Sequence, residues 1–293
     1  MEDRIITYGG QAVIEGVMMR GQRALAIAMR APDGSIALHT ERLGGIYRSR
    51  VARIPFLRGI ILLWDALGLG MRALTIAANT QTGEDERIEG TTLYITLGVA
   101  MIFGVGLFFL LPAGIGSLSE RLFGWSAWWS NLLEGALRLM LLVGYIWAIG
   151  FMPEVKRLFA YHGAEHKTIN AYEAGADLTP ETVAKFSLQH ARCGTAFLLT
   201  LVLLSVLVFT LLGPLPVLWR LASRLLLIPV LAGVALEYTR WTANHLRSRM
   251  VRWLIAPNLA LQSLTTREPD APMLEVAIQS FQTMRQAEGE YVP

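Results

Sequence analysis

The residues best suited to chemistry lie in one short run, His162-Gly163-Ala164-Glu165-His166. On a helix, His162 and His166 stand one turn apart on the same face, so their rings can share a metal ion. Glu165 lies beside them and could activate a water molecule bound to that metal. The order His-x-x-Glu-His is the inverted zinc-protease pattern. We therefore predict a divalent transition metal, zinc, with His162 and His166 as ligands and Glu165 as catalytic base.

A structural role is the alternative for the same residues. The histidines could serve as polar anchors that hydrogen-bond neighbouring loops. Three of the five histidines in the chain, His162, His166 and His190, fall between two apolar segments. This gathering favours the metal site over the anchor role.

A metal site needs more than two protein ligands. Glu173 shares the helix face but lies two turns from His166, about 10 Å along the axis, which is too far for one ion. His190 and Cys193 are better third ligands, since they are three residues apart just before an apolar segment. Thr179-Pro180-Glu181 has the composition of a helix start between the two motifs. The chain would then run out along one helix and back along another. For Cys193, a small buried thiol is the alternative.

Two further polar residues are weaker candidates. Glu15 stands among glycines, in Gly9–Gly21, and could either complete the site or cap a turn. His245 follows the last apolar segment and would lie at the same membrane interface, where a structural role is the simpler interpretation.

The hydropathy pattern indicates a membrane protein. Of 293 residues, 53% are hydrophobic and 17% are charged, whereas a soluble domain carries about a quarter charged residues. The deficit is confined to long uncharged blocks, each near the roughly 20 residues that cross a hydrocarbon core. We predict four spans: Thr91–Leu111, Leu132–Met152, Gly194–Leu212 and about Leu218–Glu237. In the second span, Glu134 and Arg138 are four residues apart and can pair on one helix face. In the fourth, Arg220 and Arg224 would extend to the interface, and Pro229 would introduce a kink.

Basic residues set the predicted orientation. The loop 153–192 holds five Lys and Arg residues and the start of the tail after the fourth span, 240–252, holds four more, whereas the loop 112–131 holds only Arg121. By the positive-inside rule the basic segments and both termini face the cytoplasm of a bacterial inner membrane. Trp125, Trp128 and Trp129 would form an aromatic belt on the outer side. Because the arginines flank apolar segments, the net charge of +3 does not indicate nucleic-acid binding.

The water-facing parts are predicted at both ends of the chain. Residues 1–53 form a small β-rich domain with strands at Ala24–Arg30 and Ser35–Glu41 around a turn at Ala31–Gly34. In the C-terminal tail, Ala271–Ala287 has helical periodicity. The predicted segments are 1–53 (β-rich domain), 54–90 (amphipathic helix and connector), 91–152 (spans 1 and 2), 153–193 (loop with the histidine motif), 194–238 (spans 3 and 4) and 239–293 (tail).

The segment 54–78 is ambiguous. Arg58, Asp65 and Arg72 recur every seven residues and so form one polar stripe on a helix. This predicts an amphipathic helix on the membrane surface or against the bundle. A spanning helix is the alternative, but it would put Arg42, Arg48, Arg50 and Arg53 on the outer side.

Four blocks of the sequence resemble the YqhQ-like family of bacterial multi-pass membrane proteins. They are Gly9–Gly21, Tyr161–Glu173, His190–Thr195 and Leu264–Glu275. The family is a domain of unknown function described as predicted metal-dependent enzymes, so the resemblance implies a multi-pass membrane protein. One departure is Ala191, where the family usually has proline, which softens the turn that places His190.

Two functions follow from these features. The first is a metal-dependent hydrolase at the cytoplasmic interface, acting on a lipid-linked or membrane-protein substrate. The second is a non-enzymatic partner in membrane-protein insertion or assembly, whose β-rich head and C-terminal helix dock a cytosolic protein or a translocon. A transporter is less favoured because three predicted spans have interiors without ionisable groups.

Overall fold

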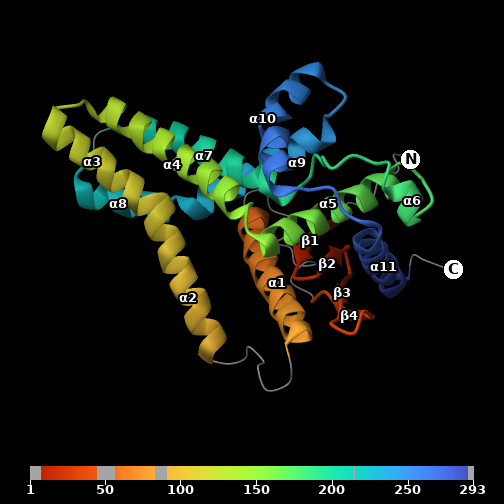
Figure 1. Ribbon diagram of the computed structural model, residues 1–293. Coiled ribbons are helices and arrows are strands. Elements are labelled where there is room, and N and C mark those ends of the chain that lie inside the picture. The colour runs from red at the N-terminus through yellow and green to blue at the C-terminus, as the bar shows by residue number, and fades with distance from the viewer. Residues whose placement is uncertain (1–7, 45–56, 83–90, 214, 290–293) are drawn as a thin grey trace.

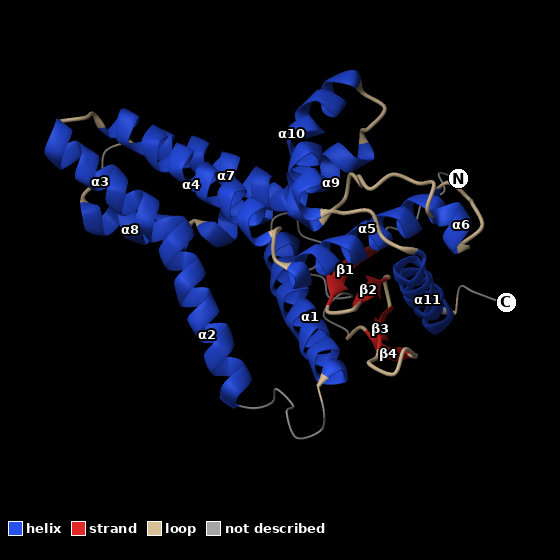
Figure 2. Ribbon diagram, in the orientation of Figure 1, coloured by secondary structure: helices blue, strands red, loops and turns tan. Residues whose placement is uncertain are grey.

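The computed structural model describes residues 8–44, 57–82, 91–213 and 215–289. The described chain is mostly helical, with one small antiparallel sheet near the N-terminus (Figure 2). Helices enclose the sheet at one end of the molecule, and long apolar helices extend away from it at the other end (Figure 1). The mainly helical class and the small N-terminal sheet predicted from the sequence are therefore confirmed.

The sheet is a four-stranded meander in the order β1-β2-β3-β4, with every neighbouring pair antiparallel. The predicted strands 24–30 and 35–41 are confirmed, and the turn between them uses Gly34 at φ 85°. The glycine-rich segment before them folds as the other two strands, which the sequence analysis did not assign. The bounds are β1 Gly9–Val13, β2 Gly16–Arg20, β3 Ala24–Arg30 and β4 Ile36–Arg42.

Both faces of the sheet are covered by helices. Alternate residues of a strand point to opposite faces, and in β3 the large side chains Leu25, Ile27 and Met29 face helix α1. The small residues Ala26 and Ala28 face helices α5 and α11. All five are buried, so the sheet is the middle layer of three.

Helix α1 (Leu57–Gln81) forms the first of these layers. Its described side chains pack on the sheet, where Ala73 and Ala77 are buried against β3. Arg72 pairs with Glu41 of β4 at 3.1 Å. The helix that we predicted on the membrane surface or against the bundle thus uses its second half to cover a sheet, and it also packs against α9 (Ile228–Asn244). The side chains of Arg58 and Asp65, and Arg48, Arg50 and Arg53, lie outside the described part of the chain.

Helices α5 (Pro153–Glu173) and α11 (Ala271–Glu288) form the third layer. The predicted C-terminal helix is confirmed, and its apolar residues Leu274, Ile278 and Phe281 are buried in the core with the sheet. Asp270 caps α11 by accepting from the Met273 amide at 2.9 Å. The two ends of the chain therefore share one hydrophobic core, as Figure 1 shows by the red strands beside the blue helix.

The apolar helices occupy the other end of the molecule. By length and composition, two helices of the described chain could cross a membrane, Ile95–Phe123 and Ala127–Ile149. A third exists if Leu218–Leu226 and Ile228–Asn244, bent by 41°, are one span. The apolar part of the predicted third span, Phe197–Leu211, is shorter. The bounds are α2 Thr91–Val105, η4 (a π-helix) Gly106–Leu110, α3 Leu111–Phe123, α4 Ala127–Ile149, α7 Gly194–Leu211, α8 Val217–Leu226 and α9 Ile228–Asn244.

The first predicted span ends later than the sequence suggested. Helix continues through η4 and α3 to Phe123, and Gly124 ends it at φ 62°. The expected loop 112–131 is therefore reduced to three residues, 124–126, before α4 begins. The uncharged stretch ends near Leu111, but polar residues beyond it continue the helix because α3 buries Ser117 and Ser119 against its neighbours.

The prediction that Arg220 and Arg224 snorkel is wrong. Each is 1% exposed, inside the helical bundle. Arg224 donates to both carboxylate oxygens of Glu134, at 2.9 and 2.7 Å, and Arg220 donates to Glu120 at 2.5 Å. The predicted pairing of Arg138 with Glu134 is confirmed at 2.8 Å. The Glu134 carboxylate thus pairs with the guanidinium groups of both Arg138 and Arg224. Because Arg220 and Arg224 have carboxylate partners inside the bundle, their side chains do not extend to water.

Two elements complete the described chain. Helix α6 (Pro180–Val183) has the predicted cap, Thr179, whose side chain accepts from the Thr182 amide, but it is a single turn. Helix α10 (Arg249–Thr265), which was not predicted, returns the chain from the end of α9 to the sheet end of the molecule (Figure 1). Both elements lie next to the histidine motif, as described below.

Candidate metal centre

Helix α5 presents the histidine motif. Gly163 lies directly against the backbone carbonyl of Arg267, in a space that a side chain would fill. The Arg267 amide in turn donates to the Phe159 carbonyl at 2.9 Å. The segment after α10 is therefore pressed against α5 beside His162, which explains why a glycine follows this histidine.

The chain after α6 returns along α5 in an irregular strand-like path rather than as the second helix we predicted. Polar side chains on one face of α5 donate to its carbonyl groups. Lys167 binds Ala184 and Phe186 at 2.7 and 2.9 Å. Asn170 binds Ser187 and Gln189 at 2.9 and 3.0 Å. These bonds bring the segment that carries His190 and Cys193 onto the face of His166.

The two motif histidines contact the backbone through the same ring nitrogen, Nδ1. The Nδ1 atom of His162 lies 2.9 Å from the Thr265 carbonyl, and that of His166 lies 2.5 Å from the Leu188 carbonyl. A carbonyl only accepts, so each Nδ1 carries the proton and each Nε2 carries a lone pair. This is the arrangement typical of metal-binding histidines, in which the outer nitrogen is tied to the protein.

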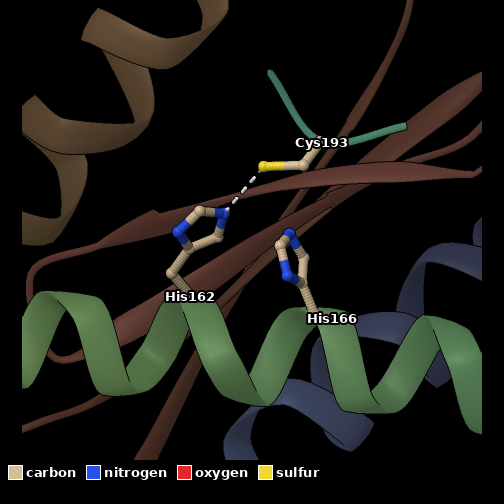
Figure 3. A group of neighbouring side chains, drawn as sticks. All are labelled: His162, His166 and Cys193. Carbon is tan, nitrogen blue, oxygen red and sulfur yellow. Dashed lines mark hydrogen bonds between the residues drawn. The ribbon is translucent and has the colours of Figure 1, made fainter. Parts of the chain in front are cut away.

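Cys193 completes a group of three ligand atoms. Its sulfur lies 3.2 Å from Nε2 of His162 (Figure 3). One ligand atom from each of His162, His166 and Cys193 lies within 4.8 Å of the others, so the group could hold a metal ion. Two imidazoles and a thiolate suit zinc, and three protein ligands leave a fourth position open, as in catalytic sites.

The surroundings favour the ligand forms of these groups. Burial lowers the pKa of His166 below its usual value, against the smaller opposing effect of Cys193, and so keeps the ring neutral. Cys193 is the cap of α7, where its sulfur accepts from the Thr195 amide at 3.4 Å.

Glu165 is buried between α5 and the sheet, with 5% of its surface exposed. A Cβ atom on Gly10 would lie 2.9 Å from the Glu165 carboxyl carbon, so the missing side chain in β1 makes room for it. Burial raises the pKa of Glu165, and His162, His190 and the Gly10 amide oppose that rise. Its Oε2 atom has no hydrogen-bond partner in the described structure. Glu165 is thus a carboxyl group that can take up a proton near the three ligands.

His190 lies next to the ligand group rather than in it. Its ring centre is 5.6 Å from that of His166, and Gln262 of α10 holds its backbone through both amide and carbonyl, at 3.0 and 2.9 Å. Its Nε2 is 3.8 Å from Glu173, which forms an ion pair with Arg192. Of the two third ligands we considered, the geometry therefore brings Cys193 to the histidines and places His190 with Glu173.

The remaining candidates lie elsewhere. Glu15 is in the β1–β2 turn with φ 52°, where the hydrogen bond from Arg157, at 2.6 Å, lowers its pKa. His245 ends α9 and contacts the Trp241 carbonyl at 2.7 Å. Neither side chain belongs to the group of ligands.

The sequence analysis did not identify several residues that shape the site. Gln262 lies in a helix with no catalytic pattern, so no local signal marks it. Gly10, Arg192 and Thr265 lie in three of the blocks that carry the family resemblance, Gly9–Gly21, His190–Thr195 and Leu264–Glu275, and that resemblance was the signal available for them.

Comparison with known proteins identifies the family. A family model described as a protein of unknown function, DUF1385, matches residues 54–287, which is most of the chain. The chain belongs to the DUF1385 family. The uncharacterized protein YqhQ of Bacillus subtilis (strain 168) is 35% identical to it, over 96% of this chain and 93% of the relative. No solved structure matches.

The DUF1385 match confirms the predicted family resemblance. The matched range contains all three ligand residues and Glu165, whereas β1 and Gly10 lie before it. The alignment with YqhQ covers nearly the whole chain, so the similarity extends over the sheet as well as the helices. The description of the DUF1385 family names no activity, and function has to be argued from the site.

Proposed function

We propose that this DUF1385 protein is a membrane-embedded, metal-dependent hydrolase that binds zinc through His162, His166 and Cys193. One observation carries the proposal. Both imidazole rings are tied through Nδ1 to backbone carbonyl groups. Nε2 of His162 lies 3.2 Å from the Cys193 sulfur, and one ligand atom from each of the three residues lies within 4.8 Å of the others.

The chain's own residues have distinct roles in this proposal. Zinc with an open fourth position supplies the Lewis acidity and the activated water that hydrolysis of an ester or amide requires. The three side chains fix its position, while Thr265 and Leu188 fix the rings. Glu165 would be the base that takes a proton from the water and passes it to the leaving group, since its Oε2 atom has no hydrogen-bond partner among the described residues.

The membrane setting indicates the kind of substrate. Cys193 immediately precedes α7, whose apolar part runs from Phe197 to Leu211. The site therefore lies where an apolar helix begins, which in a membrane is the level of the lipid headgroups. We propose four crossings, with α7 and the bent α8–α9 pair joining the two long helices, and with the site and both termini on the cytoplasmic side. A lipid-linked or membrane-protein substrate fits this position.

Metal analysis of the purified full-length protein tests the proposal. We expect about one zinc ion per chain, and loss of that zinc in the double variant His162→Ala, His166→Ala. His245→Ala is the matched control, because His245 is exposed at the end of α9 and should retain the metal. A wild-type protein that is folded and metal-free after growth in zinc-supplemented medium would refute the metal site.

The second candidate is a non-enzymatic partner in membrane-protein insertion or assembly. The apolar helix Ile95–Phe123 favours it, because only 6% of its most apolar 18-residue stretch is buried inside the molecule. Such a surface can contact another membrane protein or a translocon as well as lipid. Purification in mild detergent distinguishes the two, since this function requires a stoichiometric partner and the hydrolase does not.

A further inference from the structure

Three buried side-chain atoms around the candidate metal centre have no hydrogen-bond partner among the described residues. They are Oε2 of Glu165, Nε2 of His166 and Nε of Arg192. Buried polar atoms in proteins are nearly always paired, so unpaired ones call for an explanation. Zinc and its water account for the first two atoms. The third is a donor, and it requires an acceptor that the protein does not supply.

We propose that Arg192 binds a phosphate group of the substrate beside the metal centre. This inference rests on the proposed function, to which it adds the chemical class of the substrate. Arg192 immediately precedes the ligand Cys193, and its NH2 atom lies 3.5 Å from Nε2 of His190, whose ring stands 5.6 Å from that of His166. His190 therefore stands beside both the guanidinium group and the ligand His166, which puts Arg192 in the surroundings of the metal centre.

The guanidinium group is held ready for an anion. Glu173 forms an ion pair with Arg192 through Oε1, and both side chains are 24% exposed. This pair fixes the direction of the guanidinium group, whose Nε atom is buried and has no hydrogen-bond partner among the described residues. Arginine presents donors in a planar fork that matches two oxygens of a phosphate group.

The position in the molecule favours phosphate over other anions. Arg192 lies two residues before the start of α7, and Gly194 beside it is exposed. In a bilayer this is the depth of phospholipid phosphate groups. A soluble phosphate compound could present the same group from the cytoplasm. The shared chemistry is phosphate, and the experiment separates the two sources.

The test is calorimetric titration of the full-length protein in detergent, zinc-loaded and zinc-free, with two probes. The probes are inorganic phosphate and the short-chain lipid dihexanoylphosphatidic acid. We expect Arg192→Gln to weaken binding about tenfold or more, the usual effect of losing a charge-assisted hydrogen bond. Arg249→Gln, an exposed arginine on α10, is the matched control and should bind like wild type.

A second variant guards against a simple folding defect. Glu173→Gln removes the carboxylate that competes for the guanidinium group, and we expect it to bind phosphate several-fold more tightly. A damaged protein would not gain affinity. Stronger binding of the lipid than of inorganic phosphate identifies the membrane as the source, and equal binding identifies a soluble compound.

The two proposals fail in different ways. If Arg192→Gln keeps its zinc and binds both probes like wild type, the phosphate site is overturned and the hydrolase proposal stands. If the wild type binds no zinc, the hydrolase proposal fails, while the zinc-free titration still reports on Arg192. If neither probe binds the wild-type protein at millimolar concentration, the phosphate site is overturned.

Discussion

At the scale of single residues, the position of the Glu165 side chain depends on Gly10. The carboxyl group of Glu165 approaches β1 closely only because Gly10 has no side chain. The backbone of Gly10 also lowers the pKa of that carboxyl group, against the rise that burial causes. A strand residue that is far away in sequence thus determines where the proposed base stands.

This contact predicts different effects for two adjacent glycines. In Gly10→Ala, the new Cβ would lie 2.8 Å from the Met18 carbonyl and 2.9 Å from the Glu165 carboxyl carbon. Overpacking of this kind costs about 1–3 kcal/mol, so we expect thermal unfolding at a lower temperature. Gly9→Ala is the control, because its Cβ would have no heavy atom within 4 Å. Equal melting temperatures for the two variants would contradict the close approach of Glu165.

Cys193 offers a second test at this scale, because it is the one cysteine of the chain. A sulfur bound to zinc has its lone pair engaged, so it reacts slowly with alkylating reagents. We expect removal of zinc by a chelator to raise the rate of labelling at Cys193 at least about tenfold. Mass spectrometry after timed exposure to iodoacetamide measures the rate.

The double variant His162→Ala, His166→Ala provides the control for this labelling. Without the histidine ligands, zinc should have no effect on the rate. A rate in the wild-type protein that is the same with and without chelator would show that Cys193 is not a ligand. The anchor role of the histidines would then be the better interpretation.

At the scale of elements, the return segment between α6 and α7 matters most. Its carbonyl groups at 184, 186, 187, 188 and 189 all accept from side chains of α5. Sequence patterns located α5 and the cap of α6, because helix periodicity and capping are local signals. They could not show the irregular path that follows, because side chains of another element hold it in place.

Asn170 tests the importance of this segment for the site. Its side chain binds the carbonyls of Ser187 and Gln189, on either side of the Leu188 carbonyl that orients His166. Loss of an outer contact of a metal ligand typically costs 10–100-fold in metal affinity. Asn170 does not contact His166 itself but holds the segment whose Leu188 carbonyl does. We therefore expect Asn170→Ala to lower zinc affinity by about tenfold, and competition with a chromophoric chelator measures that affinity.

Gln189→Ala is the control for Asn170→Ala, since the Gln189 side chain is exposed and its carbonyl remains. It should bind zinc like wild type. If Asn170→Ala also binds zinc like wild type, the return segment does not need this support, and the ring of His166 must be oriented by the rest of the site.

The buried charges of the helical bundle are the second feature at this scale. Glu134 binds both Arg138 and Arg224, and all three side chains are 1–2% exposed. Removing one member of a buried ion pair typically costs about 3–5 kcal/mol, because the remaining charge loses its partner. We therefore expect Glu134→Ala to lower the melting temperature in detergent strongly, whereas Glu181→Ala, at an exposed position, should not.

A triple replacement completes this prediction. Changing Glu134, Arg138 and Arg224 together to leucine removes every charge of the network, and apolar replacements of complete networks are often tolerated. We expect the triple variant to be more stable than Glu134→Ala alone. A triple variant that is less stable than Glu134→Ala would mean that these side chains stabilise the bundle by packing rather than by charge pairing.

At the scale of the whole molecule, the two ends of the chain combine in one core. The Ser280 hydroxyl donates to carbonyls of Val17 and Ala26, and Glu288 accepts from the amides of Arg23 and Ala24. The sequence predicted the strands and the C-terminal helix separately. It could not show that they pack together, because no local pattern records a contact between residues some 265 positions apart.

The same limit applied to the apolar helices. Uncharged length located the apolar segments, but it set the end of the first one too early and assigned Arg220 and Arg224 to water. Both errors have one cause. A charged or polar residue near an apolar run was taken as a boundary, whereas in the molecule these residues face inward and find partners on neighbouring helices.

The orientation of the molecule in the membrane is the last prediction. The segment 153–192 is rich in Lys and Arg, whereas Arg121 is the one basic residue of 112–131, so the positive-inside rule places the histidine motif in the cytoplasm. We expect an impermeant maleimide on intact cells to label Ser126→Cys but not Asp177→Cys, both in a Cys193→Ser background. Both positions are exposed, so permeabilised cells should show both labelled. Labelling of Asp177→Cys alone would reverse the orientation and move the proposed substrate to the outer face.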